Sequence, residues 1–262
     1  MIKAFLQCFE GIHVYASGRR DETLAKASSL GAEAHKDNDY VVRNSDVVFL
    51  SVKPYHFPVL YSQVNRDSWE GKVVVSVMAG VKLETLEKAL VGAEVFRAMP
   101  NINAFVGRST TAVATNNAAV RNESRDLVDK LFRCLGTVYW VPEEYLDIWT
   151  GLVGSGPAFI AEIIDGLVLG AVASGMSREV AYNAVLDMID GTVKLLKELK
   201  IHPIEVRDEV TTPAGTTING LKVFESKGVK AGLMEIVETA YKRSVEIGNE
   251  VNKAIKTKLQ MI

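Results

Sequence analysis

Two threonines at a predicted helix start are the residues of this chain best suited to holding a small anion. The segment Arg207–Thr217 reads Arg-Asp-Glu-Val-Thr-Thr-Pro-Ala-Gly-Thr-Thr. Pro213 disfavours helix at the residue before it, and Gly215 favours a tight turn. Thr216 or Thr217 can then cap the next helix. Two hydroxyls and several unpaired backbone N–H groups would converge there, which suits a carboxylate without any Arg or Lys. The alternative is an ordinary helix entry that binds nothing.

A second chemical cue follows the apolar stretch Ile12–Ala16. Ser17, Arg19 and Arg20 stand where an NAD-specific protein usually shows Asp or Glu for the ribose 2′-hydroxyl. Arg and Ser at this place would suit a 2′-phosphate, which favours NADP. A solvated basic turn is the alternative.

Three further predicted strands end in small or polar residues, at Ser51–Pro54, Ser76–Gly80 and Arg97–Asn101. Ligands of doubly wound sheets bind beyond the carboxyl ends of strands, and small residues there let a flat ring or a ribose approach the backbone. The alternative for each of these segments, taken alone, is an ordinary strand end without a ligand. The run Gly151–Ala158 reads Gly-Leu-Val-Gly-Ser-Gly-Pro-Ala. It predicts either close backbone approach beside a helix N-terminus or a flexible hinge between domains.

The glycine-rich turn that normally opens a dinucleotide-binding sheet does not occur in this sequence. Such sheets begin with a strand and a G-x-G-x-x-G turn, whereas Met1–Glu10 has the pattern of the helix that would follow them. We therefore expect the first strand and the phosphate-cradling glycines to be missing from the sheet.

The composition argues against several classes of partner. The chain has 262 residues and a formal net charge of -2, with Lys and Arg scattered among Asp and Glu. We therefore expect no nucleic acid and no membrane as partner. Cys8 and Cys134 fall in helical patterns without partner spacing, and we predict free buried thiols in a reducing compartment. The histidines are isolated from one another, which predicts no metal site.

Targeting segments are not expected either. Met1–Glu10 lacks the charged start, apolar centre and cleavage site of a secretory signal. The longest apolar region, Pro157–Ala173, carries Glu162 and Asp165, and the run after Asp165 is too short to cross a membrane. The sequence thus predicts a cytoplasmic protein.

The elements that must position these residues change character near residue 144. Upstream, short apolar stretches alternate with helical patterns, which is typical of a parallel sheet covered by helices. The predicted strands are Ile12–Ala16, Asp46–Val52, Lys72–Val77, Glu94–Ala98, Thr110–Ala114 and Thr137–Val141. The predicted helices are Met1–Glu10, Asp21–Leu30, Tyr40–Asn44, Leu83–Leu90 and Glu123–Leu135.

Downstream of residue 144 the sequence shows only helical patterns punctuated by Gly and Pro. We predict a helix over Pro157–Ser174 that Gly175 ends, and a second helix, capped by Ser177, that runs to about Leu199. The first helix is apolar almost all round, which favours an oligomer interface and, less strongly, a membrane. The predicted fold class is α/β. Residues 1–144 form a Rossmann-like NADP-binding domain without its first strand, and residues 145–262 form an all-α dimerisation and substrate domain.

Taken in this order, the motifs resemble those of the pyrroline-5-carboxylate reductases, the last enzymes of proline synthesis. The resemblance covers essentially the whole chain. Gly154–Ala158, and His202-Pro203 leading to the Thr212–Thr217 box, carry it most specifically, and Ser45–Pro54 and Met99–Asn101 match as well. It implies an NAD(P)H-dependent oxidoreductase that transfers a hydride to the C=N bond of 1-pyrroline-5-carboxylate and gives L-proline. It also implies a homodimer joined by the helical domain, or a decamer of five dimers.

The resemblance implies roles for the matching positions. The family contacts its nicotinamide nucleotide at the positions of Asn38, Ser51, Val52, Lys53, Pro54, Val77, Met78 and Ala79. It meets the adenosine end at the positions of Ser17, Arg19 and Arg20. Its substrate loop corresponds to Gly215, Thr216 and Thr217, and backbone N–H groups there take the carboxylate. Thr217 matches the threonine placed to hydrogen-bond the ring nitrogen. The implied cofactor is NADP(H), with NAD(H) as the alternative.

The sequence departs from the family at several of these motifs. Ala214 replaces the first glycine of the usual Pro-Gly-Gly, which costs about 1 kcal/mol if this residue needs a positive φ. Val153 stands where Ser is usual, Glu209 adds a negative charge, and Asn103 replaces a common proline. Two alternatives therefore stay open: a reductase of another cyclic imine, and a non-catalytic oligomeric homologue that has lost dinucleotide binding.

Overall fold

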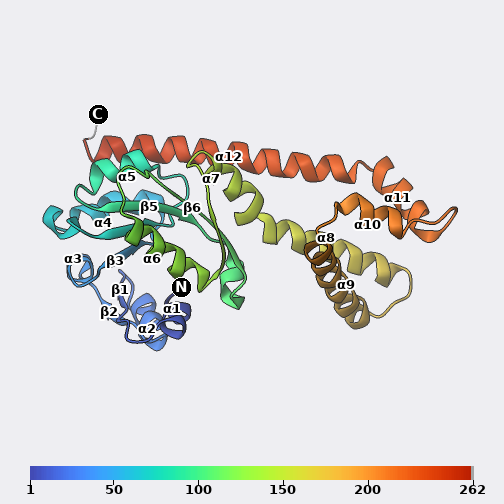
Figure 1. Cartoon of the computed structure of the whole chain (residues 1–262), viewed down its shortest axis with the longest axis horizontal. Coiled ribbons are helices and arrows are strands. Elements are labelled where there is room, and N and C mark those ends of the chain that lie inside the picture. Colours follow the sequence, from blue (N-terminus) through green and yellow to red (C-terminus); the bar gives the residue numbers. More distant parts are fainter. Residues whose placement is uncertain (261–262) are drawn as a thin grey trace. The chain divides into compact units, whose positions relative to one another are not determined.

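The computed structural model of this chain describes residues 1–260, which fall into two compact units (Figure 1). The first unit comprises Met1–Ser155 together with Glu238–Ile262, and the second comprises Gly156–Val237. Contacts therefore return the end of the last helix to the first unit, whereas the sequence predicts a single boundary at residue 144. That boundary stays a prediction.

The strands of the first unit form two sheets. Their bounds are β1 Tyr15–Ser17, β2 Glu33–His35, β3 Val47–Leu50, β4 Val73–Ser76, β5 Glu94–Met99, β6 Ser109–Thr115 and β7 Gly136–Trp140. β1 pairs in parallel with β2, a short strand that the sequence did not reveal, and the larger sheet has the order β3-β4-β5-β6-β7. In a doubly wound sheet the first strand lies between the counterparts of β1 and β3. The split thus falls where the strand expected to be missing would pair.

One strand pair of the larger sheet is antiparallel, which corrects the expectation of a wholly parallel sheet. β5 and β6 run in opposite directions, with Phe96 opposite Thr115, whereas the other neighbours are parallel. The connection between β5 and β6 holds only the 3₁₀-helix η3 (Ile102–Val106). It is too short for the crossover that a parallel pair needs.

Helices cover both faces of the five-stranded sheet (Figure 1). The elements outside the sheets are α1 Ile2–Cys8, α2 Asp21–Ser29, α3 Asn38–Arg43, η1 Pro54–His56, α4 Phe57–Ser62, η2 Arg66–Trp69, α5 Leu83–Ala89, α6 Asn122–Arg133 and α7 Tyr145–Trp149. On one face, α5 and the end of α12 (Val229–Lys258) enclose a core that includes Leu50 and Ile255. On the other face, α1 and α6 pack through Phe5 and Phe132.

A disulfide joins Cys8, at the end of α1, to Cys134, at the C-cap of α6, with the Cα atoms 6.0 Å apart. The prediction of two free buried thiols is therefore wrong, and Cys8 is exposed. The sequence could not show the pairing because the cysteines are 126 positions apart in separate elements that meet only in the folded unit. The disulfide and the packing of Phe5 against Phe49, with ring centroids 5.3 Å apart, hold α1 on this face.

The second unit is built from helices. They are α8 Gly156–Ala173, α9 Arg178–Leu199, α10 Pro203–Glu209, α11 Thr216–Ser226 and the first part of α12. α8 and α9 pack against each other, and the turn between them has Gly175 at φ +99°. The Ser177 hydroxyl accepts a hydrogen bond from the Val180 N–H at 3.4 Å. The predicted end of α8 and the predicted cap of α9 are thus confirmed.

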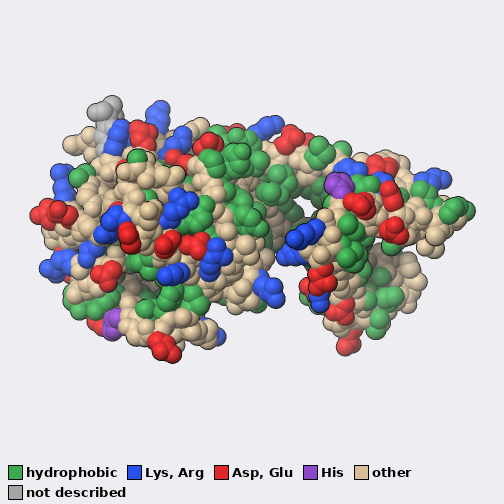
Figure 2. All heavy atoms as spheres, viewed as in Figure 1, with side chains coloured by type: hydrophobic (Ala, Val, Ile, Leu, Met, Phe, Trp, Pro, Cys, Tyr) green, Lys and Arg blue, Asp and Glu red, His purple; other side chains and the backbone are tan. Residues whose placement is uncertain are grey.

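Most apolar side chains of this unit stay at its surface. Val168 and Ala181 are buried, whereas Ile160, Ile163 and Leu167 of α8 are 49%, 37% and 46% exposed. Figure 2 shows such hydrophobic side chains on the surface. By length and composition alone, the helical stretch Tyr145–Ala173 is long and apolar enough to cross a membrane. The expectation that no segment of the chain crosses a membrane stays a prediction.

Candidate active site

The ends of β3 and β4 bring two predicted cofactor segments side by side. Leu50 pairs with Ser76, and just beyond them the Val77 N–H donates to the Leu50 carbonyl at 3.2 Å. Ser51–Pro54 and Val77–Ala79 therefore leave the sheet at the same edge. Doubly wound sheets bind their ligands at this edge.

Arg19 connects the exit of β1 to these segments. Its guanidinium donates to Nε2 of His56 in η1, 3.0 Å away. Burial and the neighbouring Arg19 charge lower the pKa of His56, so its ring is neutral at pH 7 and accepts this bond. Ser17 is half-buried and Arg20 is exposed on either side of Arg19. The structure thus brings Arg19 to the segment that follows β3, and Ser17 and Arg20 lie beside it in sequence.

A buried carboxylate fixes Asn38 at the start of α3. The Asn38 amide donates to Gln63 Oε1 at 2.7 Å. The neighbouring Asp39 carboxylate accepts hydrogen bonds from the Ser68 hydroxyl at 2.7 Å and from the Asn65 backbone and side chain at 3.0 and 2.8 Å. Burial alone would raise the pKa of Asp39, but these hydrogen bonds hold it below its ordinary value. Asp39 therefore stays ionised and anchors α3.

The turn after β4 offers its backbone to a ligand. Met78 is buried and donates its N–H to the Ser76 hydroxyl at 3.3 Å, while Val77 and Ala79 are half-buried. Gly80 closes the turn at φ +75°. Small, partly exposed side chains at this place leave room for a flat ring against the backbone.

α11 begins at a glycine N-cap. Gly215 is the N-cap residue and supplies no side-chain cap, and Thr216 and Thr217 are the first two helical residues. The prediction that either threonine caps the helix is therefore wrong. Thr216 is exposed and Thr217 is half-buried. The first N–H groups of a helix lack intrahelical acceptors, and its dipole favours an anion there.

Backbone geometry restricts the residues in the turn before α11. A Cβ on Gly215 would overlap the hydroxyl oxygen of Thr212. Ala214 has φ +57°. A positive φ is unfavourable for a residue with a Cβ, so the alanine costs about 1 kcal/mol relative to glycine at this position. The Asn219 side chain donates to the Gly215 carbonyl at 2.9 Å and fastens the turn to α11. The substrate residues belong to the second unit and the cofactor residues to the first.

The glycine-rich run after α7 is helical, with Thr150–Gly154 forming a π-helical turn (η4). A Cβ on Gly151 would lie 2.8 Å from the backbone nitrogen of Tyr241. Gly151 therefore lets the backbone of α12 approach closely, whereas the approach of a ligand to this run stays a prediction. The Val153 carbonyl accepts a hydrogen bond from the Asn101 amide at 3.3 Å, which joins this run to the exit of β5.

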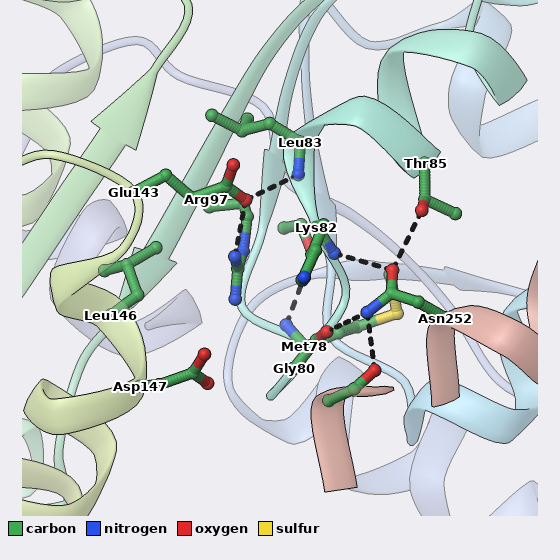
Figure 3. Close-up of polar contacts among 12 residues, drawn as sticks. Met78, Gly80, Lys82, Leu83, Thr85, Arg97, Glu143, Leu146, Asp147 and Asn252 are labelled. Carbon is green, nitrogen blue, oxygen red and sulfur yellow. Dashed lines mark hydrogen bonds and ion pairs between the residues drawn. The ribbon is translucent and has the colours of Figure 1, made fainter. Parts of the chain in front are cut away.

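A buried ion pair near the strand ends was not predicted. Arg97 in β5 is 4% exposed, and its guanidinium donates to Glu143 Oε1 at 2.6 Å. The same oxygen accepts the Leu83 N–H at 2.7 Å and so caps α5 from a distant segment (Figure 3). The sequence does show one charged residue, Arg97, inside an apolar strand. A buried charge there requires a partner of opposite charge, but the sequence does not indicate which residue that is.

A Rossmann-like sheet with polar and small residues at its strand ends, joined to a helical unit, defines the class of dinucleotide-dependent oxidoreductases. Residues 1–80 match the family model described as NADP oxidoreductase coenzyme F420-dependent. Residues 143–247 match the model described as Pyrroline-5-carboxylate reductase dimerisation.

Similar proteins extend this match over nearly the whole chain. The chain is 38% identical to the pyrroline-5-carboxylate reductase of Methanosarcina acetivorans, over 85% of this chain and 83% of that protein. It is 35% identical to the reductase of Aquifex aeolicus over 94% of each. The structure of 1-pyrroline-5-carboxylate reductase from Streptococcus pyogenes superposes with a TM-score of 0.84 at 26% identity, over 93% of each chain. The chain therefore belongs to the pyrroline-5-carboxylate reductase family, as an NADP-dependent oxidoreductase. The predicted family, fold class and enzyme class are confirmed.

Proposed function

We propose that this chain reduces the C=N bond of 1-pyrroline-5-carboxylate with a hydride from NADPH and so forms L-proline. The observation that carries the proposal is the start of α11. A tight turn, free backbone N–H groups and the half-buried Thr217 suit a small carboxylate beside a ring nitrogen. The relatives from Methanosarcina acetivorans and Aquifex aeolicus are named for this reaction.

The residues at the strand ends fit NADPH. The exposed guanidinium groups of Arg19 and Arg20 can pair with the 2′-phosphate, and Ser17 can hydrogen-bond to it. The nicotinamide nucleotide would lie against Asn38, Ser51, Val52, Lys53, Pro54, Val77, Met78 and Ala79. NADPH supplies the hydride when bound. NADH lacks the 2′-phosphate, so we expect it to be the weaker cofactor.

The substrate would lie at the start of α11. Backbone N–H groups of Gly215, Thr216 and Thr217 would hold the carboxylate. The Thr217 hydroxyl would hydrogen-bond to the ring nitrogen, and because a hydroxyl is a weak acid it would orient the ring and relay a proton. The imine carbon, which is C2 of the pyrroline ring and becomes C5 of proline, gains the hydride and the nitrogen gains a proton. The C=N bond thereby becomes the C–N bond of proline, and NADPH becomes NADP⁺. Alignment and exclusion of water are the main demands of this step.

The proposed assembly is a homodimer through the second unit, with a decamer of five dimers as the larger form. The exposed residues Ile160, Ile163 and Leu167 recur at helical spacing, as on a face that another helix covers. A second copy explains this face better than lipid does, because Glu162 and Asp165 lie between these residues in sequence. We propose no membrane and no nucleic acid as partner.

The proposed location is the cytoplasm, where amino-acid synthesis takes place. The disulfide between Cys8 and Cys134 opposes this proposal, because cytosolic reductants keep most thiols reduced. Alkylation of free thiols in intact cells before lysis tests it. Labelled cysteines agree with the proposal, and fully protected cysteines indicate an oxidising compartment or a shielded bond.

The activity is tested by mixing the purified chain with NADPH and following the absorbance of the cofactor. We expect no fall without an imine, a fast fall with 1-pyrroline-5-carboxylate and a slower fall with the six-membered cyclic imine. Faster turnover of the larger ring would indicate a reductase of another cyclic imine. A fluorescence titration without micromolar NADPH binding would indicate the non-catalytic homologue. Cofactor binding without turnover of either imine contradicts the proposed reaction.

A further inference from the structure

Asn252 ties the C-terminal helix α12 to the turn that follows β4. It is 6% exposed, and its side-chain amide makes four hydrogen bonds (Figure 3). Oδ1 accepts from the Lys82 N–H at 3.0 Å and from the Thr85 hydroxyl at 2.8 Å. Nδ2 donates to the carbonyls of Gly80 at 2.5 Å and Gly248 at 2.6 Å. Every hydrogen-bonding position of the amide is therefore used.

The groups around Asn252 require an amide of this length. The Lys82 N–H can only donate and the Gly80 carbonyl can only accept, so the two ends of the amide are distinguished. An aspartate would turn a carboxylate oxygen toward two carbonyl oxygens. An alanine would leave those buried groups without partners, which is costly away from water.

Helix and turn also touch through their backbones. A Cβ on Gly80 would lie 2.7 Å from the Gly248 Cα atom. Gly248 precedes Asn252 by one helical turn and lies on the same face of α12. Backbone contact therefore keeps the turn from moving toward α12, and the amide keeps it from moving away.

We propose that Asn252 is a positioning residue for the cofactor. By holding Gly80 and Lys82 it sets the place of the Val77–Ala79 backbone that immediately precedes them. Ser76 and Met78 are 1% and 2% exposed, so the stretch before Gly80 is closely packed. A shift of Gly80 would therefore also shift the backbone of this stretch. The inference rests on the proposed function, in which Val77, Met78 and Ala79 contact the nicotinamide nucleotide.

The test compares two anchors of the same helix. Asn252→Asp keeps the size of the side chain but removes the hydrogen bond to the Gly80 carbonyl of the turn and the hydrogen bond to the Gly248 carbonyl of α12. Ser244→Ala removes a different anchor, the hydrogen bond from the Ser244 hydroxyl to Asp147 Oδ1 at 3.0 Å, which does not touch the turn. Both variants and the parent chain are titrated with NADPH, unfolded by heat, and assayed for the Michaelis constant of the imine substrate.

We expect Asn252→Asp to raise the Kd of NADPH about tenfold, because the turn loses its hydrogen bond from Nδ2 and its Gly80 carbonyl then faces a carboxylate oxygen. The Michaelis constant of the imine should stay within about twofold of the parent, as should the Kd of NADPH for Ser244→Ala. An unchanged Kd in Asn252→Asp overturns the inference. So does an equal rise in Ser244→Ala, because Asn252 would then only dock the helix.

A milder variant decides the question if Asn252→Asp does not fold. Thr85→Val removes one of the four hydrogen bonds, and we expect the Kd of NADPH to rise about two- to threefold. An unchanged Kd overturns the inference. A parent chain that binds NADPH but reduces no imine contradicts the proposed reaction and leaves the binding comparison valid. A parent chain that does not bind NADPH contradicts both.

Discussion

The two units support their parts of the proposed site in different ways. In the first unit the cofactor residues stand on three strand ends and at the start of α3, over a core in which Leu50 and Val74 are buried. In the second unit the substrate residues stand on one short turn, and Val168 and Ala181 are its buried hydrophobic residues. The cofactor half is thus supported by a buried core, whereas the substrate half sits on helices whose apolar faces are exposed. Substitutions in the structural elements should therefore act through folding in the first unit and, under the proposed dimer, through association in the second.

The largest effect is expected on the exposed face of α8. Leu167→Glu would place a charge in the proposed dimer interface once in each copy. We expect the association constant to fall about a thousandfold or more, measured by analytical ultracentrifugation. Val91→Glu, at a residue of the first unit that is 75% exposed, is the matched control and should keep the parent mass. An unchanged mass for Leu167→Glu would show that α8 is not the interface.

The disulfide should dominate the stability of the first unit. We expect Cys8→Ser to lower the free energy of unfolding by about 2–5 kcal/mol, because the bond closes a long loop in the unfolded chain. Urea unfolding measures this change. Reductant should destabilise the parent by the same amount and leave the variant unaffected. Equal stability of parent and variant in oxidising buffer would contradict the prediction.

Substitutions in the turn before α11 should change the turnover of the imine substrate and leave NADPH binding unchanged. Gly215→Ala brings a Cβ against the Thr212 hydroxyl, and we expect kcat/KM for the imine to fall about a hundredfold through misplaced N–H groups. The Kd of NADPH should not change. Gly220→Ala, in the same helix, meets open space and is the control. A loss of NADPH affinity in Gly215→Ala would contradict the assignment of separate halves.

Arg19 should distinguish the two cofactors. Arg19→Ala removes a charged partner of the 2′-phosphate, and we expect the Kd of NADPH to rise about tenfold while that of NADH stays constant. Fluorescence titrations of both cofactors measure the ratio, with Arg66→Ala on the exposed side of η2 as control. Equal losses for NADPH and NADH would mean that Arg19 does not contact the 2′-phosphate.

The smallest effect concerns acid stability. The folded pKa of Asp39 lies below its unfolded value, so its contribution is present at neutral pH and is lost as the pH falls below about 4. Asp39→Asn should therefore cost on the order of 1 kcal/mol at pH 7, and the difference from the parent should shrink in acid. Urea unfolding at several pH values measures it. A difference that is constant with pH would contradict the ionised hydrogen-bonded carboxylate.

Local patterns predicted most of the elements and several parts of the site. The exits at Ser51–Pro54 and Val77–Ala79 follow from short apolar strands, which depend on neighbours in sequence, so the sequence alone reveals them. The strain at Ala214 was expected from the family resemblance, which puts a glycine at this position.

Features that join distant segments stayed hidden. Cys8 contacts Cys134, and Asn252 contacts the turn at Gly80, only through the folding of the whole unit, because each pair is far apart in sequence. A polar residue in a long helix has the same pattern whether it faces solvent or holds four hydrogen bonds. The choice between these depends on which face of α12 packs on the first unit, and no local pattern carries that information.

Transfer of a labelled hydride tests the central claim most directly. The parent chain is incubated with 1-pyrroline-5-carboxylate and NADPH that carries deuterium on the transferred position of C4, and the proline is analysed by mass spectrometry and NMR. The account predicts L-proline with one deuterium on C5, formed only when chain, cofactor and imine are all present. Labelled cofactor that stays intact, or proline without deuterium at C5, would contradict it.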